Sequence, residues 1–189
     1  MEYSKTIPSI SDCVAGNEYA IEQFICQYQG VVFRLAISVL QDEHEASDAT
    51  QDTFIAALKA MNRYQDYSTV KAWLYTIALN ICRSRLRKRK AMDNIKRAVT
   101  ALFQVDSQKQ DNPEDSVIKN QKDQALWRAL QKLGEKHRLS VLLYYYHELP
   151  VAEIAEILKT NEGTIHSRLF TARARLRIEM EKQLQAAGE

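Results

Sequence analysis

The chain has 189 residues, of which 46% are hydrophobic and 26% are charged, and its formal net charge is +2. This length suits one ordinary domain or two small ones, and the hydrophobic fraction is high enough to fill a core. Only 5 Gly and 3 Pro occur, which disfavours a sheet built on tight turns and favours helices.

The cysteines and the amino terminus bear on the cellular compartment. The three cysteines are isolated and odd in number, so we expect no disulfide framework and no metal site, and we expect the thiols to pack as small apolar groups in a reducing cytosol. The first twelve residues lack the apolar stretch of a signal peptide. No apolar run approaches the roughly 20 residues of a membrane span, so we predict a cytoplasmic protein without one.

The charge is unevenly distributed along the chain. Residues 1–60 contain nine acidic and three basic side chains, whereas residues 83–97 contain eight basic side chains and one acidic side chain. A nearly neutral protein with segregated charge presents different faces to different partners.

The first half of the chain has the periodicity of three amphipathic helices. Apolar residues recur at spacings of three and four over residues 21–39, 46–61 and 70–81. Asp42, three residues before Glu45, has the spacing of a capping box and predicts where the second helix begins. Three apolar stripes are enough for a small helical bundle.

A basic run, NICRSRLRKRK over residues 80–90, ends the third predicted helix. Alone, such a run is more often a solvated helix end than a binding site. Here it adjoins aromatic residues, and aromatic rings beside a basic groove suit single-stranded nucleic acid, whose bases stack while its phosphates are neutralised. Tyr64 and Tyr67 lie in the break between helices and are the better candidates, because Trp73 lies on the apolar stripe and is expected to be core.

The middle of the chain changes composition. Residues 95–103 carry a weaker apolar stripe that either extends the third helix or packs separately. Residues 104–116 contain one apolar residue and one proline, and we interpret them as an exposed linker. Leucines over residues 126–133 begin a second helical block, and Gly134 predicts a break in the helix directly after them.

Two helical patterns follow in the second block. The first is a helical face that Leu139 and Leu142 share with Tyr145 and Tyr146 and that ends before Pro150. The second is a helical pair, described next.

Residues 151–183 have the pattern of a helix-turn-helix. Apolar side chains share one face over residues 151–158 and again from residue 164 to residue 183, and KTNEG between them supplies turn chemistry. The second helix of this motif enters the major groove of DNA, where Arg pairs with guanine edges and Ser, Thr and His contact bases or phosphates. An arginine-rich solvated face on a core helix hairpin explains the same residues, and this pattern alone does not decide between the two.

Three segments in this order resemble the bacterial extracytoplasmic-function (ECF) sigma factors of the sigma-70 family. They are HEASDATQDTFIAALKAMNRY, KAWLYTIALNICRSRLRKRK and LPVAEIAEILKTNEGTIHSRLFTARARLR. The resemblance covers residues 15–183. It implies an all-α fold of two small helical domains joined by a flexible linker, with the helix-turn-helix in the second domain. The expected bounds are 15–95, 96–120 for the linker, and 121–184.

The resemblance also implies the function of a promoter-specificity subunit of RNA polymerase, without catalytic residues or a cofactor of its own. The first domain would dock on the clamp helices of the largest polymerase subunit and would bind and melt the −10 element. The second domain would contact the flap of the polymerase and read the −35 element, while the linker would thread toward the RNA exit channel. Members of the family are commonly held inactive by an anti-sigma factor, which can retain them at the membrane.

By the same resemblance, three groups of residues are expected to bind these partners. The polymerase-binding group is Asp48, Gln51, Asp52 and Phe54. The group for the double- and single-stranded DNA of the −10 element is Tyr64, Tyr67, Lys71, Asn80, Arg83, Arg85, Arg87, Lys88 and Arg89. The group for the −35 element is Glu162, Thr164, His166, Ser167, Arg168, Thr171, Arg173 and Arg175.

Two departures from the family pattern affect the helix-turn-helix. Lys159 replaces the small turn residue of many such motifs. His166 stands where a Lys is common, so the resemblance does not predict which −35 sequence the protein recognises.

Other classes of protein remain as alternatives. A repressor could use the same helix-turn-helix, but it would not need the acidic helix or the basic aromatic segment. A helical adaptor with no role on DNA would leave both basic runs as solvated surface, and a strong salt dependence of DNA binding would exclude it. An enzyme is the least favoured alternative, because the four histidines lack metal-ligand spacing and no Gly-rich phosphate loop is present.

Overall fold

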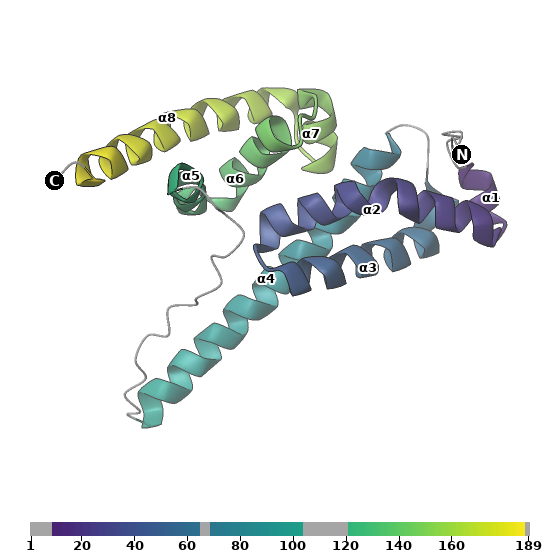
Figure 1. The fold of residues 1–189 in the computed structure, drawn as a ribbon, viewed down its shortest axis with the longest axis horizontal. Coiled ribbons are helices and arrows are strands. Elements are labelled where there is room, and N and C mark those ends of the chain that lie inside the picture. Colours follow the sequence, from purple (N-terminus) through teal and green to yellow (C-terminus); the bar gives the residue numbers. More distant parts are fainter. Residues whose placement is uncertain (1–8, 65–68, 104–120, 188–189) are drawn as a thin grey trace. The chain divides into compact units, whose positions relative to one another are not determined.

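The computed structural model describes residues 9–64, 69–103 and 121–187, and over these residues it contains helices and no strands (Figure 1). The chain divides into two compact units, Met1–Arg97 and Ala98–Glu189, called unit 1 and unit 2 here. The predicted all-α fold of two helical parts is thereby confirmed. The finer domain bounds stay a prediction, since residues 104–120 lie outside the described part of the chain.

Unit 1 is a bundle in which α2 and α3 run antiparallel against the first half of α4 (Figure 1). Its helices are α1 (Ile10–Val14), α2 (Glu18–Leu40), α3 (Glu43–Ala60), the 3₁₀ turn η1 (Met61–Arg63) and α4 (Val70–Phe103). Sequence periodicity predicts the three long helices but not the short α1.

The connection between α2 and α3 is only two residues long. Gln41 adopts a left-handed conformation with φ of 57° and ends α2. The carboxylate of Asp42 accepts a hydrogen bond of 2.7 Å from the backbone amide of Glu45, which satisfies one of the free amides at the start of α3. The helix start that Asp42 predicts is therefore confirmed.

Apolar side chains from all three long helices fill the core of unit 1. Phe24, Leu35 and Leu79 are fully buried, and the ring of Phe24 packs edge-on against Phe54 with 6.1 Å between centroids. Burial of each such side chain stabilises the fold by about 1.5–3 kcal/mol relative to exposure.

The three cysteines of unit 1 do not share one environment. Cys13 and Cys82 are buried, as expected for small apolar groups, but Cys26 is exposed, so that expectation is wrong for Cys26. Burial raises the pKa of the Cys82 thiol to about 11, more than the nearby Arg85 charge lowers it.

Helix α2 is a long and largely apolar helix. Among the described residues, it is the one helix long and apolar enough, by length and composition alone, to cross a membrane, a test that the core helix of a globular protein also passes. Phe24, Val32 and Leu35 of α2 are nevertheless completely buried within the protein. Helix α2 has the packing of a core helix in a globular bundle.

Helix α4 continues well beyond the bundle. All side chains of residues 87–95 are exposed, and the second half of the helix projects from unit 1 (Figure 1). Of the two alternatives left open for residues 95–103, the structure shows the first, because these residues extend α4 to Phe103.

Unit 2 is a compact array of shorter helices ending in the long α8. Its elements are α5 (Gln121–Lys132), α6 (Glu135–Val141), the π-helical turn η2 (Leu142–Tyr146), α7 (Val151–Ile157) and α8 (Glu162–Ala187). Gly134 separates α5 from α6, as predicted. Leu139, Leu143 and Ile154 are among its completely or almost completely buried side chains.

The π-helical turn η2 changes which side chains face the core. The backbone amide of His147 donates a hydrogen bond of 3.0 Å to the carbonyl oxygen of Leu142, five residues earlier. The predicted face over residues 139–146 is correct for Leu142 but wrong for Tyr145 and Tyr146, which are each 52% exposed. The wider turn displaces them from the stripe that an α-helix would have formed.

Candidate nucleic-acid interfaces

Helices α7 and α8 form the helix-turn-helix that the sequence predicts, joined by residues 158–161. The side-chain oxygen of Asn161 accepts a hydrogen bond of 2.7 Å from the backbone amide of Thr164 and lies 2.7 Å from its hydroxyl. This contact caps α8, which begins at Glu162, two residues earlier than the apolar pattern predicts. Ile165, Leu169 and Ala172 of α8 are buried, as expected.

The turn of this motif contains a strained residue. Lys159 has a φ of 50°, which lies in the left-handed region. In this region the Cβ atom of any residue other than Gly crowds the backbone. The departure that the sequence shows at this position therefore carries a conformational cost.

The opposite face of α8 is open to solvent. All eight residues predicted to contact the −35 element retain exposure: Glu162, His166, Ser167, Arg173 and Arg175 are exposed, and Thr164, Arg168 and Thr171 are half-buried. Sequence reasoning missed Phe170, which is 70% exposed on the same helix. Its exposure could have been predicted from its position, because Phe170 lies off the apolar stripe formed by Ile165, Leu169 and Ala172.

Within the described residues, no carboxylate lies within ion-pair distance of Arg168 or Arg175. Both charges act instead on His137 of α6, whose pKa is lowered first by burial and then by the charges of Arg175 and Arg168. Farther along α8, Glu179 pairs with Lys132 of α5, and Glu181 accepts a hydrogen bond of 2.9 Å from Arg177. The cationic face of α8 is therefore unpaired near its amino terminus and paired near its carboxyl terminus.

An aromatic pair lies at the start of α4 in unit 1. The rings of Tyr64 and Trp73 are 5.1 Å apart between centroids, and both side chains are half-buried. The expectation that Trp73 is plain core is wrong in this respect. Asn80 is exposed, and its spacing of seven from Trp73 and from Arg87 places the three on one side of α4.

The remaining predicted residues of this group have mixed positions. The ammonium of Lys71 lies 5.6 Å from the ring centroid of Tyr75, which is buried. Arg83 is half-buried, and Arg87 and Lys88 are exposed. Tyr67 lies outside the described residues.

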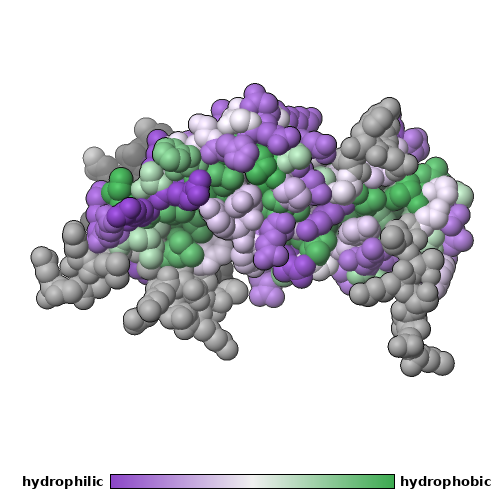
Figure 2. All heavy atoms as spheres, turned by 90° about the horizontal axis from the view of Figure 1, so that it is seen from above, coloured by the Kyte–Doolittle hydropathy of each residue, from purple (hydrophilic) through white to green (hydrophobic). Residues whose placement is uncertain are grey.

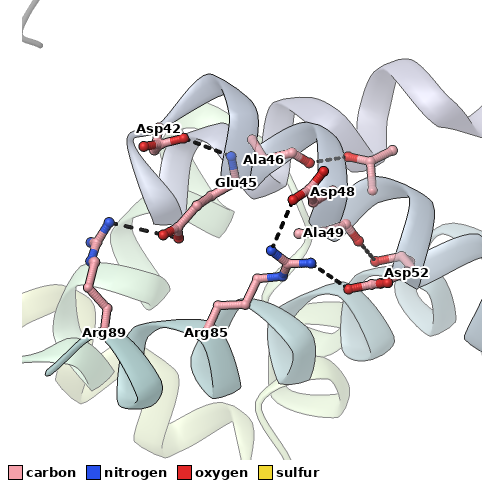
Figure 3. Close-up of polar contacts among 10 residues, drawn as sticks. Asp42, Glu45, Ala46, Asp48, Ala49, Asp52, Arg85 and Arg89 are labelled. Carbon is pink, nitrogen blue, oxygen red and sulfur yellow. Dashed lines mark hydrogen bonds and ion pairs between the residues drawn. The ribbon is translucent and has the colours of Figure 1, made fainter. Parts of the chain in front are cut away.

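Two of the predicted phosphate ligands point toward α3 (Figure 3). An Nη of Arg85 donates a hydrogen bond of 2.6 Å to Asp52, and its other Nη lies 3.6 Å from Asp48. The hydrogen bond to Asp52 is the largest cause that raises the pKa of Arg85. Arg89 lies 3.8 Å from Glu45, one turn farther along. Both guanidinium groups thus lie within ion-pair distance of carboxylates on α3, and that of Arg85 is also hydrogen-bonded to one of them.

Helix α3 leaves three of its polar side chains exposed. Asp48, Gln51 and Asp52 are exposed, whereas Phe54 is only 5% exposed and packs in the core, so a direct contact of Phe54 with another protein is excluded while unit 1 is folded. Ile55, which sequence reasoning missed, is 53% exposed among the three polar residues. In the space-filling view, apolar side chains appear between hydrophilic ones on the surface (Figure 2).

Comparison with known proteins identifies the family. The family model Sigma-70 region 2 matches residues 24–92, and Sigma-70, region 4 matches residues 123–176. The ECF RNA polymerase sigma factor SigM of Bacillus subtilis is 33% identical, with 83% of this chain and 93% of that protein covered. The RNA polymerase sigma-H factor of Pseudomonas aeruginosa is 29% identical, with 84% of each covered.

A solved structure agrees with these matches. The sigma factor RpoE in complex with the anti-sigma factor NepR from Bartonella quintana superposes with a TM-score of 0.64 at 26% identity, and 85% of this chain and 96% of that chain are covered. The chain belongs to the sigma-70 family of RNA polymerase sigma factors, within its ECF group. Its function is that of a promoter-specificity factor in transcription initiation, and the resemblance seen in the sequence is confirmed.

Proposed function

We propose that this sigma factor uses three separate surfaces: the outer face of α3 for core RNA polymerase, the aromatic and basic side of α4 for the −10 element, and the exposed face of α8 for the −35 element. One observation carries the proposal. The chain contains a helix-turn-helix whose helix α8 has an unpaired cationic face near its amino terminus. The same chain contains a second helical unit, in which the acidic helix α3 lies beside the basic helix α4 and its aromatic pair.

Docking on the polymerase rests on the composition of the α3 surface. Asp48, Gln51 and Asp52 supply charge and hydrogen-bonding capacity, and the exposed Ile55 supplies an apolar anchor among them. Interfaces commonly place an apolar contact inside a polar rim, and complementary charge speeds and orients association. The partner proposed for this face is basic, as the clamp helices of the largest polymerase subunit are expected to be. Phe54 supports the face from beneath.

Opening of the −10 element is assigned to the other side of unit 1. Tyr64 and Trp73 offer aromatic surface on which an unpaired base can stack, with a contribution of about 1–3 kcal/mol per stacked base. Asn80 can hydrogen-bond an exposed base edge, and Arg87 and Lys88 can neutralise the strand phosphates. Tyr67 and Lys71 stay predicted members of this surface.

Reading of the −35 element is assigned to the first turns of α8. Arg168 has the donor geometry for the two acceptors of a guanine edge, and Phe170 is an apolar group that suits the methyl of a thymine. Arg173 and Arg175 are proposed as phosphate ligands, and the capped amino terminus of α8 favours a further phosphate.

The partners outside the promoter complex are proposals as well. The complex of RpoE with NepR supports an anti-sigma factor as a partner of this protein. Because core polymerase acts in the cytoplasm, we place the protein there, with retention at the membrane by an anti-sigma factor as one form of control. Contact of unit 2 with the polymerase flap is part of the same proposal.

Run-off transcription with purified core polymerase tests the proposal directly. Promoter fragments from the source genome would be transcribed with and without this protein, and transcripts that depend on it are expected to share two upstream elements. DNA binding by the protein alone, with no dependent transcripts and no binding to core polymerase, would instead support a repressor that uses the same helix-turn-helix. The absence of both activities would leave the basic helices as solvated surface.

A further inference from the structure

A histidine outside the helix-turn-helix lies near two of the arginines proposed to bind DNA. His137 is in the first turn of α6, the helix that packs against α8. Its side chain is half-buried, and the charges of Arg175 and Arg168 both act on it. These three side chains therefore form one cluster to which α6 and α8 both contribute.

The cluster lies along one flank of the open face of α8. Arg168, Thr171 and Arg175 follow one another at spacings of three and four, so they share one side of the helix. Arg168 and Thr171 are half-buried and Arg175 is exposed, so this side lies between the buried stripe and the open face. In a duplex bound to the open face, the base edges lie over its centre and the backbone lies over its flanks. A phosphate, rather than a base edge, is therefore expected beside His137.

The surroundings of His137 disfavour its protonated form in the free protein. Burial is the largest cause that lowers its pKa below the ordinary value of 6.5, and the charges of Arg175 and Arg168 lower it further. Its charged neighbours on α6 itself are Glu135, Lys136 and Arg138. The turn η2, which also packs on α6, contains tyrosines and no charged side chain. The imidazole is therefore mainly neutral at neutral pH.

We propose that His137 and Arg175 form a phosphate clamp, in which a backbone phosphate of duplex DNA accepts hydrogen bonds from the imidazolium on α6 and the guanidinium on α8. The inference rests on the proposed function of α8. The phosphate offsets the charge of Arg175 and favours the protonated imidazole. Because the free imidazole is mainly neutral, DNA binding takes up a proton, and the affinity for DNA rises as the pH falls.

The size of the effect follows from the half-buried position of His137. A hydrogen bond between charged groups contributes more than an exposed ion pair does. We therefore expect the clamp to make binding about threefold to tenfold tighter at about pH 5.5 than at about pH 8, the range over which histidine changes its charge.

Fluorescence anisotropy of a labelled duplex, titrated with the holoenzyme across this pH range, tests the clamp. The duplex would carry the −35 element identified by run-off transcription. His137→Gln should lose the extra affinity at low pH, whereas the matched control His166→Gln should retain it, because His166 lies on the open face of α8 and outside the cluster. A duplex with an altered −35 element should show the same pH dependence, since a phosphate contact does not read sequence. Circular dichroism at each pH would verify that each variant is folded.

NMR of the histidine ring protons in the full chain supplies a second reading. The chain has four histidines, so His137→Gln identifies the resonance of His137. Its pKa should rise in Arg175→Ala, because one of the charges that lower it is removed. An unchanged pKa would overturn the cluster on which the clamp depends.

The remaining outcomes separate the clamp from the proposed function. Loss of the pH dependence in His166→Gln alone would assign the proton to the open face of α8 and overturn the clamp. The same pH dependence in the wild type and in His137→Gln would also overturn it, while binding of the duplex would still support reading by α8. Failure of an assembled holoenzyme to bind either duplex would reject reading by α8 and the clamp with it.

Discussion

The two long basic helices, α4 in unit 1 and α8 in unit 2, neutralise their charges in different ways. On α4, Arg85 and Arg89 pair with carboxylates of the neighbouring helix α3. On α8, Arg168 and Arg175 have no acidic partner among the described residues. A run of basic residues therefore does not by itself define an available cationic surface. Its availability depends on what the adjacent helix carries.

The largest effect expected from a single substitution concerns the independence of the two units. Phe54→Ala should destabilise unit 1 by about 3–5 kcal/mol, because it removes a buried ring that packs against Phe24. Urea unfolding followed by Trp73 fluorescence in a Trp127→Phe background would measure it, since the chain has 2 Trp, one in each unit. Trp127 in a Trp73→Phe background should report an unchanged unit 2.

The neighbouring residue supplies the control for that substitution. Ile55→Ala removes an exposed side chain and should leave the unfolding of unit 1 within about 0.5 kcal/mol of the wild type. It should instead weaken binding to core polymerase. A shift of both tryptophan transitions by Phe54→Ala would show that the units unfold together, contrary to this comparison.

Alkaline pH should also separate the units, because all three cysteines lie in unit 1. The pKa of Cys82 in the folded state, about 11, lies above its ordinary value of 9.0, so the folded state retains a proton that the unfolded state loses. Stability is therefore fully present below pH 9.0 and falls as the pH rises toward 11, by about 2–3 kcal/mol at about 1.4 kcal/mol per pKa unit. Urea midpoints reported by Trp73 across this range would measure the loss. In Cys82→Ala that part of the loss should vanish; an identical pH dependence would contradict the assignment.

The free cations of α8 should be the ones that distinguish DNA sequences. Arg168→Ala is expected to weaken binding of the cognate −35 element by about 1–3 kcal/mol and to relax the preference at one base pair. Arg175→Ala is expected to weaken binding to every sequence about equally and to reduce the salt slope by about one phosphate contact. Electrophoretic mobility shifts of the holoenzyme on matched and mismatched duplexes would measure both. Equal losses on all duplexes for Arg168→Ala would identify a phosphate contact instead.

The smallest expected effect is a gain of stability confined to unit 2. Lys159→Gly removes the strain of a left-handed residue, which costs the folded state about 1–2 kcal/mol. It also destabilises the folded state by about 0.5–1 kcal/mol, because Gly gives the unfolded chain more conformational freedom. The net result is a stabilisation of between zero and about 1.5 kcal/mol, measured by Trp127 fluorescence in urea. Lys159→Ala keeps the left-handed residue and should show no gain. An equal gain of stability in both variants would show that the Lys side chain, and not the left-handed backbone, causes the effect.

Local patterns in the sequence predict much of this fold because local forces determine helix ends and buried stripes. Asp42 predicts the start of α3 through its contact with the Glu45 amide, and Ile165 and Leu169 mark the buried side of α8. Patterns fail where the helix type changes. Tyr145 and Tyr146 leave the expected stripe because η2 is a π turn.

The pairings within the candidate sites could not be predicted from the sequence. Arg85 and Asp52 are 33 residues apart, and their contact depends on how α3 and α4 are rotated about their axes. The tilted contact between the rings of Tyr64 and Trp73 likewise depends on where the end of η1 lies relative to α4. Exposure on a known helix, in contrast, follows from position alone, which is why Ile55 and Phe170 could have been found by projecting each helix onto a wheel.

The apolar length of α2 has a consequence for synthesis on the ribosome. A nascent chain emerges amino terminus first, so the apolar face of α2 is exposed before α3, which packs against it, has been made. The 18 residues of α3 take roughly 1–4 s to translate at about 5–20 residues per second. The two-residue connection at Gln41 and Asp42 lets α3 fold back on α2 as soon as it emerges, since such local contacts form quickly. A longer connection would extend the time during which the apolar face of α2 is exposed to solvent.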